Sequence, residues 1–172
     1  LITTFRSTRE RVKPSPAQRS DTKQDLHNTM SNKSWRAIIV LIFFLFVTLS
    51  MWNSAMNFYF RYDVDQKALV DFLSIFGLSV ELDHAYSVGF SVFNISAALV
   101  QFLAIIGFSH RLASRYGKKE VISTCLVVTA VLTALLWIPT KTDVAFMFIL
   151  NLLRSFAYAI TIPLVWAMMG DV

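Results

Sequence analysis

Four long apolar runs constrain the fold of this chain more than any other feature. They cover residues 37–60, 86–108, 121–138 and 144–169. A helix of roughly 20 apolar residues is long enough to cross the hydrocarbon core of a bilayer, and each run is near or above that length. The sequence therefore predicts an all-α membrane protein with four transmembrane helices.

The composition supports a membrane protein and gives no sign of an enzyme. Of the 172 residues 55% are hydrophobic and 16% are charged, whereas soluble domains carry about 25% charged residues. The lone cysteine, Cys125, excludes an intrachain disulfide and makes a cysteine-based metal site improbable. Because the chain also lacks a phosphate-binding glycine loop and a metal-spaced histidine pair, we expect no catalytic residues, no metal site and no cofactor.

The placement of the charges predicts the orientation of the chain in the membrane. The net charge is +5, and basic residues gather before the first run and again in residues 110–119, whereas residues 61–83 carry five carboxylates. Short cytoplasmic loops retain Lys and Arg, so the two basic segments are expected inside and the acidic segment outside. Charge held in loop blocks also argues against a nucleic-acid-binding surface. We expect a multi-pass protein of the inner (plasma) membrane.

Two domains are expected. Residues 1–34 resemble a cytoplasmic linker, in which Ser20 is placed to cap a short amphipathic helix that ends before Asn32. Residues 35–172 are expected to form part of a C-terminal transmembrane domain.

The outer loop of that domain, residues 61–85, contains a further apolar stretch at residues 68–80. This stretch is too short to span a bilayer. We expect an interfacial or re-entrant helix there.

Polar side chains recur at three- and four-residue steps within three of the four runs, so they share one face of each helix. Polar groups in membrane helices normally face the bundle interior or a wet cavity. The predicted substrate-binding or cavity-lining residues are Ser50, Asn53, Asn57 and Arg61 in the first run, Ser91, Asn94 and Gln101 in the second, and Asn151, Arg154, Tyr158 and Trp166 in the fourth. The alternative for each residue is a helix-packing hydrogen bond, worth about 0.6 kcal/mol on average.

The third run carries hydroxyl groups but no amide or charge, and these hydroxyls can bond to their own helix backbone. We therefore expect it to face lipid, outside the cavity.

Arg154 is the one charged residue deep within a run. It lies eleven residues, or roughly 16 Å of helix, beyond Asp143, which places it near mid-membrane. We expect a carboxylate, a carbonyl or a water-filled cavity as its partner, because an unpaired charge there is costly. A role in transport and a structural ion pair both remain open. Trp52 and Trp166 could stack on sugar rings or anchor helix ends at the interface.

Five strings of the chain carry a resemblance to a known family. They are TFRSTRERV at 4–12, NKSW at 32–35, NFYFRY at 57–62, LASRYGKK at 112–119 and PLVWAMMGDV at 163–172. In this order and spacing they resemble the glycoside-pentoside-hexuronide:cation symporters, a branch of the major facilitator superfamily. The resemblance implies a fragment that covers the central loop and helices seven to ten of a twelve-helix carrier.

The resemblance also assigns residues at the cytoplasmic side. It implies gating or loop roles for Arg115, Gly117, Lys118, Lys119 and Asp171, with Gly117 supplying a tight turn. Ser114 stands where the superfamily often has Asp, which weakens the case for a gating salt bridge. The main cation-binding carboxylates of the family would lie outside this chain.

The expected function is cation-coupled symport, with sodium or protons, of a sugar or glycoside by alternating access. The expected partners are that small molecule, the lipid bilayer and the other transmembrane helices of the same polypeptide. Two alternatives remain open: a non-transporting four-helix membrane receptor or anchor, and a lipid carrier on the same fold.

Overall fold

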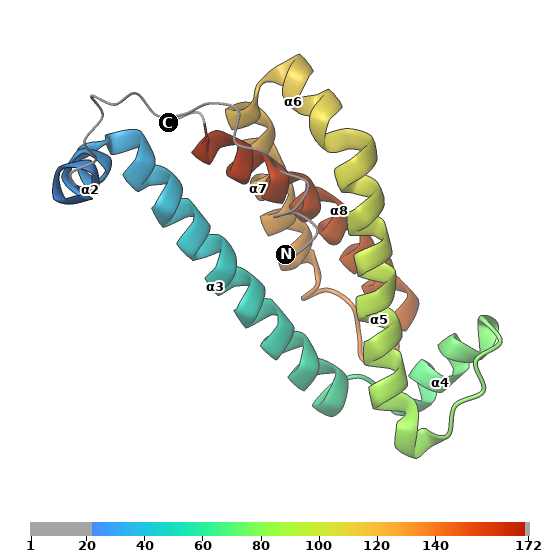
Figure 1. Cartoon of the computed structure of the whole chain (residues 1–172). Coiled ribbons are helices and arrows are strands. Elements are labelled where there is room, and N and C mark those ends of the chain that lie inside the picture. Colours follow the sequence, from blue (N-terminus) through green and yellow to red (C-terminus); the bar gives the residue numbers. More distant parts are fainter. Residues whose placement is uncertain (1–21, 171–172) are drawn as a thin grey trace, which may run out of the picture. The chain divides into compact units, whose positions relative to one another are not determined.

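The computed structural model describes residues 22–170, and all regular secondary structure within them is helical (Figure 1). This confirms the predicted all-α class. The elements are α2 Thr22–Ser31, α3 Lys33–Tyr62, α4 Gln66–Ile75, α5 Leu82–Ala104, the π-helix η1 Ile105–Ser109, α6 His110–Tyr116, α7 Lys118–Leu135 and α8 Val144–Met169.

The chain divides into two compact units, the first ending at Arg36 and the second beginning at Ala37. The first unit contains α2 and the start of α3. Oδ1 of Asn32 accepts hydrogen bonds from the backbone N–H groups of Ser34, at 3.0 Å, and Trp35, at 3.4 Å. Asn32 therefore caps the first turn of α3, while the expected capping residue Ser20 lies outside the described residues.

Three helices in residues 22–170 are long and apolar enough to cross a membrane. They are α3, the continuous helix Leu82–Tyr116, and α8. The predicted third run differs: α7 is 18 residues long, but it opens with three charged residues and ends at Leu135 rather than at 138. Its apolar part is correspondingly shorter than that of the other three helices.

The expected loop conformation of residues 110–119 is wrong, because nearly all of this segment is helical; its place on the inner side stays a prediction. The helix that begins with α5 passes through η1 and α6 to Tyr116 without a break. No proline interrupts this stretch, and a π-turn accommodates an extra residue within a helix. Gly117, with φ +85°, is the single residue between α6 and α7.

Three of the predicted loop residues therefore lie in helices. Arg115 lies in the last turn of α6, and Lys118 and Lys119 open α7. Gly117 makes the sharp turn expected of it, since its positive φ is a conformation that glycine adopts without strain. Asp171 lies outside the described residues.

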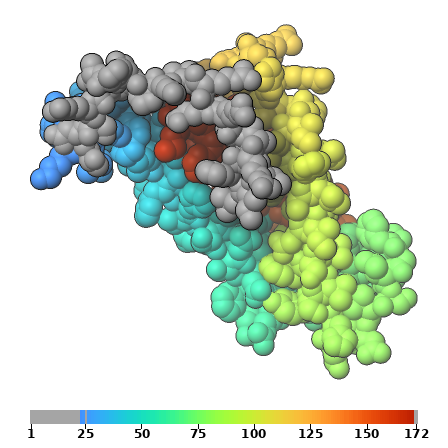
Figure 2. Space-filling model, in the orientation of Figure 1, coloured from blue at the N-terminus to red at the C-terminus, as the bar shows by residue number. Residues whose placement is uncertain are grey.

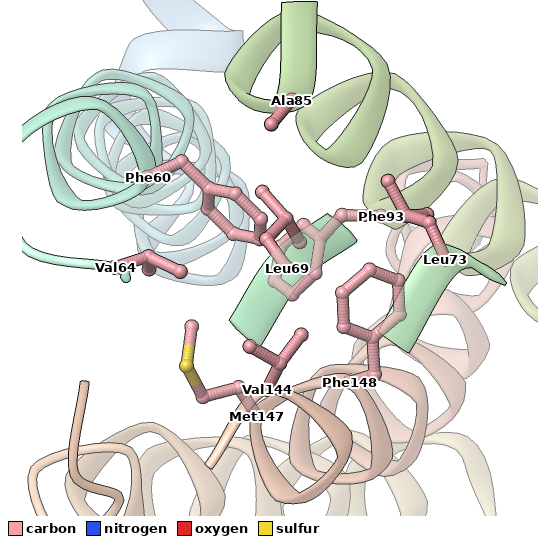
Figure 3. Packing of buried hydrophobic residues seen from close by; sticks show 9 residues of the cluster. All are labelled: Phe60, Val64, Leu69, Leu73, Ala85, Phe93, Val144, Met147 and Phe148. Atoms are coloured by element: carbon pink, nitrogen blue, oxygen red, sulfur yellow. The ribbon is translucent and has the colours of Figure 1, made fainter. Parts of the chain in front are cut away.

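An aromatic and aliphatic cluster holds four helices of the second unit together (Figure 3). Phe60 of α3 packs on Phe93 of α5 with 4.8 Å between ring centroids, and Phe93 packs on Phe148 of α8 at 5.2 Å. Leu69 and Leu73 of α4 are fully buried in the same cluster. A ten-residue helix is about 15 Å long, so α4 covers one end of the bundle without spanning a bilayer, while its place at the outer membrane surface stays a prediction.

The turn between α7 and α8 is tied to the end of α3. Nζ of Lys141 lies 2.9 Å from the Asp63 carboxylate, and the backbone carbonyl of Lys141 accepts a hydrogen bond from Asp65 N–H at 3.0 Å. The hydrogen bond and negative charge of Asp63 raise the pKa of Lys141. Within the turn, hydrogen bonds from the hydroxyl and N–H of Thr140 hold the pKa of the Asp143 carboxyl below its ordinary value.

Candidate functional site

The polar faces of α3 and α5 meet at one pocket. Both helices are visible on the face shown in Figure 2, α3 in cyan and α5 in yellow-green. The pocket has a volume of about 390 Å³ and is open to the surface. We call it the amide pocket; it is lined by Asn53, Ser54, Asn57 and Phe58 of α3 and by Phe90 and Asn94 of α5. Three of the predicted cavity residues, all asparagines, therefore lie together.

The asparagines of the amide pocket keep unused hydrogen-bonding groups. The Tyr86 hydroxyl donates to Oδ1 of Asn57 at 2.9 Å. The amide N–H groups of Asn53 and Asn94 donate to carbonyls of their own helices at 3.0 and 2.9 Å. Within residues 22–170 this leaves Oδ1 of Asn53 and Asn94 as acceptors and the Asn57 amide as a donor, so the pocket can bind a ligand that both donates and accepts.

Four other predicted cavity residues on α3 and α5 lie outside the amide pocket. Ser50 and Ser91 are exposed, and the Ser91 hydroxyl donates to a carbonyl of its own helix at 2.7 Å. Arg61 is exposed with its guanidinium carbon 5.5 Å from the ring centroid of its neighbour Tyr62. Gln101 is half-buried. The polar faces of both helices thus extend beyond the pocket.

The polar face of α8 is buried and does not line the amide pocket. Nδ2 of Asn151 donates to the Phe93 carbonyl of α5 at 3.4 Å. The Tyr158 hydroxyl donates to the Leu45 carbonyl of α3 at 3.2 Å. These two predicted cavity residues therefore join helices. Trp166 is 55% exposed and lines an apolar groove beside α3.

Arg154 has an aromatic partner that the sequence reasoning missed. Its guanidinium carbon lies 3.5 Å from the ring centroid of Trp52 on α3. Arg154 is 5% exposed, its Nε has no hydrogen-bond partner, and it forms no ion pair with any residue in 22–170. Within residues 22–170 the partner of the guanidinium is thus a ring face, where a carboxylate, a carbonyl or a water-filled cavity was expected.

The observed helix ends place the two side chains at matching positions. Trp52 lies ten residues before the last residue of α3, and Arg154 lies ten residues after the first residue of α8. Because the end of α3 and the start of α8 lie at the same end of the bundle, equal spacing puts the two side chains at equal depth. Stacking on tryptophan is also a known use of the arginine side chain.

Two hydroxyl groups of α7 bond to their own helix backbone, as predicted for the third run. Oγ1 of Thr129 donates to the Cys125 carbonyl, and Oγ1 of Thr133 donates to the Thr129 carbonyl, both at 2.7 Å. Both groups are thus satisfied within their own helix. At the other end of α7, Nζ of Lys118 donates to the Ala167 carbonyl at 3.4 Å, where a cation complements the C-terminal dipole of α8.

A comparison with known families shows the family to which the chain belongs. A family model described as MFS/sugar transport protein matches residues 1–172. The chain belongs to this family. No curated protein and no solved structure gave a significant match. Membership in the MFS/sugar transport family, together with three helices of membrane-spanning length within residues 22–170, makes this a membrane transport protein of the major facilitator superfamily.

Proposed function

We propose that the protein is a cation-coupled symporter of a sugar or glycoside, of the glycoside-pentoside-hexuronide:cation type, in the inner membrane. The family match supports sugar transport in general. The amide pocket between α3 and α5 is the structural observation that supports binding of a sugar or glycoside. By alternating access, such a carrier would expose this pocket to one side of the membrane at a time.

The chemistry of the amide pocket suits a sugar. Each sugar hydroxyl is both a donor and an acceptor, and the pocket offers both kinds of group from three asparagines. The rings of Phe58 and Phe90 supply apolar faces for the C–H surface of a sugar. A lipid chain would leave these amide groups without partners, which disfavours a lipid carrier.

The coupling cation is proposed to be sodium or a proton, bound outside the described residues. Residues 22–170 contain no group of three or more His, Cys, Asp or Glu side chains that could hold a metal ion. The resemblance to the symporters also assigns the main cation-binding carboxylates to other parts of the polypeptide.

Uptake by the full gene product that contains this chain tests the proposal. Cells that express it are given radiolabelled lactose, xylose or glucuronate, with and without sodium and at two external pH values. We expect Asn94→Leu to lower kcat/KM about tenfold, since one lost hydrogen bond is worth about 1.4 kcal/mol. Thr133→Val is the matched control, because its hydroxyl bonds only to its own helix.

Two results would contradict this proposal. One is the absence of cation-dependent uptake for all three sugars when the protein is present in the membrane. The other is equal uptake by Asn94→Leu and Thr133→Val, which would remove the amide pocket from substrate binding.

A further inference from the structure

Tyr86 of α5 contacts two residues of the amide pocket, although it does not line the pocket itself. Its hydroxyl donates to Oδ1 of Asn57 on α3 at 2.9 Å. Its ring is stacked on that of Phe90, with 6.3 Å between the ring centroids and 12° between the ring planes. Phe90 follows Tyr86 by four residues and therefore lies on the same face of α5. A side chain next to the pocket thus holds one polar and one aromatic group of the pocket.

Asn57 is bound differently from the other two asparagines of the pocket. The amide nitrogens of Asn53 and Asn94 each donate to the carbonyl four residues earlier in their own helix, at 3.0 and 2.9 Å. Their Oδ1 atoms are left as acceptors. In Asn57 the oxygen is occupied by Tyr86, and the amide nitrogen makes no hydrogen bond within residues 22–170. The three asparagines therefore offer one donor, from Asn57, and two acceptors.

The hydroxyl of Tyr86 accounts for this difference. The backbone carbonyl of Asn53 lies four residues before Asn57, so Asn57 has the same kind of acceptor on its own helix as Asn53 and Asn94 have. Asparagine side chains readily bond to nearby backbone groups of their own chain. When the Tyr86 hydroxyl is removed, we expect the Asn57 amide to turn and donate to that carbonyl. The three asparagines would then offer three acceptors and no donor.

The ring contact of Tyr86 can be separated from its hydrogen bond. The ring of Phe90 also contacts Phe60, a fully buried residue of α3, with 5.7 Å between the ring centroids. Replacement of Tyr86 by phenylalanine keeps the stacked ring and removes only the hydroxyl. The position of Phe90 in the pocket should therefore be unchanged in Tyr86→Phe, and a change in ligand selectivity can be assigned to Asn57.

We propose that Tyr86 is a positioning residue that sets the substrate selectivity of the amide pocket. By binding Oδ1 of Asn57, it keeps the Asn57 amide as a donor to one hydroxyl oxygen of a bound sugar, while two other hydroxyls donate to Asn53 and Asn94. This inference rests on the proposed function. It narrows the substrate class to sugars that present two donating hydroxyls and one accepting hydroxyl on the bound face.

Competition by deoxyfluoro sugars for uptake by the full gene product tests this role. Fluorine in place of a hydroxyl accepts a hydrogen bond weakly and cannot donate one. The probe is whichever of lactose, xylose and glucuronate is transported. The inhibition constant Ki is measured for each monodeoxyfluoro derivative of that sugar and divided by Ki of the parent sugar, in the unsubstituted carrier and in Tyr86→Phe.

One ring position should respond to the loss of the Tyr86 hydroxyl. In the unsubstituted carrier, fluorine at the position bound by Asn57 should raise Ki less than about threefold. In Tyr86→Phe the same derivative should bind about tenfold more weakly, which is the effect of one lost hydrogen bond. KM of the parent sugar should change less than about threefold, because its hydroxyl can rotate and donate to the turned Asn57 oxygen.

Tyr158→Phe is the matched control. The Tyr158 hydroxyl also joins two helices, by donating to the Leu45 carbonyl of α3 at 3.2 Å, but neither residue lines the amide pocket. This variant should leave the relative Ki of every derivative unchanged. In an Asn57→Leu background, Tyr86→Phe should have no further effect on the relative Ki values, because Tyr86 acts through Asn57.

Thermal unfolding supplies a readout that needs no sugar. Tm of the purified full gene product in detergent is measured for Tyr86→Phe, Asn57→Leu and the double variant. Both single variants remove the same hydrogen bond. The decrease in Tm of the double variant should therefore be smaller than the sum of the two single decreases.

The outcomes separate this inference from the proposed function. Unchanged relative Ki values in Tyr86→Phe, or equal changes in Tyr86→Phe and Tyr158→Phe, would contradict the role of Tyr86 in selectivity. Additive decreases in Tm would contradict the hydrogen bond to Asn57. If none of the three sugars is taken up by the unsubstituted protein, the proposed function fails and the role in selectivity fails with it, whereas the unfolding cycle still tests the contact between Tyr86 and Asn57.

Discussion

Gly117 occupies a backbone conformation that other residues avoid. Its φ of +85° and ψ of 147° separate α6 from α7 in a single residue. A Cβ added at Gly117 meets no atom within 4 Å, so a substitution there acts through the backbone alone. We expect Gly117→Ala to lower the free energy of unfolding by about 1–3 kcal/mol, measured by thermal unfolding of the purified full gene product in detergent.

Gly107 provides the matched control at the residue scale. It lies in η1 without a positive φ, and a Cβ there also meets no atom within 4 Å. Gly107→Ala should keep or raise the unfolding temperature, because alanine is favoured over glycine in helices by up to about 1 kcal/mol. Equal unfolding temperatures for the two variants would contradict the role of backbone strain at Gly117.

At the scale of elements, α4 packs closely on α5 at a position where α5 has a glycine. A Cβ added at Gly89 would lie 2.5 Å from Cδ2 of Leu69, a fully buried side chain. Gly89→Ala should therefore destabilise the fold by about 1–3 kcal/mol through overpacking. Thermal unfolding of Gly89→Ala, Leu69→Ala and the double variant checks this.

The double variant tests whether α4 and α5 are in tight contact at Gly89 and Leu69. Leu69→Ala alone opens a cavity and should cost about 2–5 kcal/mol, but the added methyl of Gly89→Ala then has room. The losses of unfolding free energy in the two single variants should sum to more than the loss in the double variant. Strict additivity would mean that α4 does not press on α5 at this point.

At the scale of the whole molecule, the charge pattern predicts which ends of the helices face outward. Glu81, in the acidic segment, and Lys119, near the start of α7, are both exposed. In a Cys125→Ser background, a membrane-impermeant maleimide should label Glu81→Cys in intact cells. Lys119→Cys should be labelled only after permeabilisation. Labelling of Lys119→Cys in intact cells would contradict the proposed orientation.

Much of the element structure could be predicted from hydrophobicity. The fourth run was expected at 144–169, and α8 is Val144–Met169, because Asp143 and the apolar residues that follow mark the helix start clearly. The helix from Leu82 to Tyr116 was expected to end near 108. Charged residues mark where the apolar run ends, but a helix continues until its backbone is interrupted, here at Gly117.

The candidate site was only partly predictable for a similar reason. Helical spacing correctly grouped Asn53 with Asn57, and these meet Asn94 at one pocket. The same spacing grouped Asn151, Arg154 and Tyr158, but it did not show that other helices cover that face of α8. Periodicity describes directions around one helix axis and says nothing of which helix lies in each direction.

The sequence by itself determined the membrane class, the helical content and the polar face of each helix, because these depend on local hydrophobicity and backbone geometry. Only the tertiary structure decided that the ring of Trp52 covers Arg154 and that the asparagines of α3 and α5 share a pocket. Such pairings depend on how each helix is rotated and crosses its neighbours. That arrangement follows from the packing of all side chains together, among them the cluster around Phe60 and Phe93.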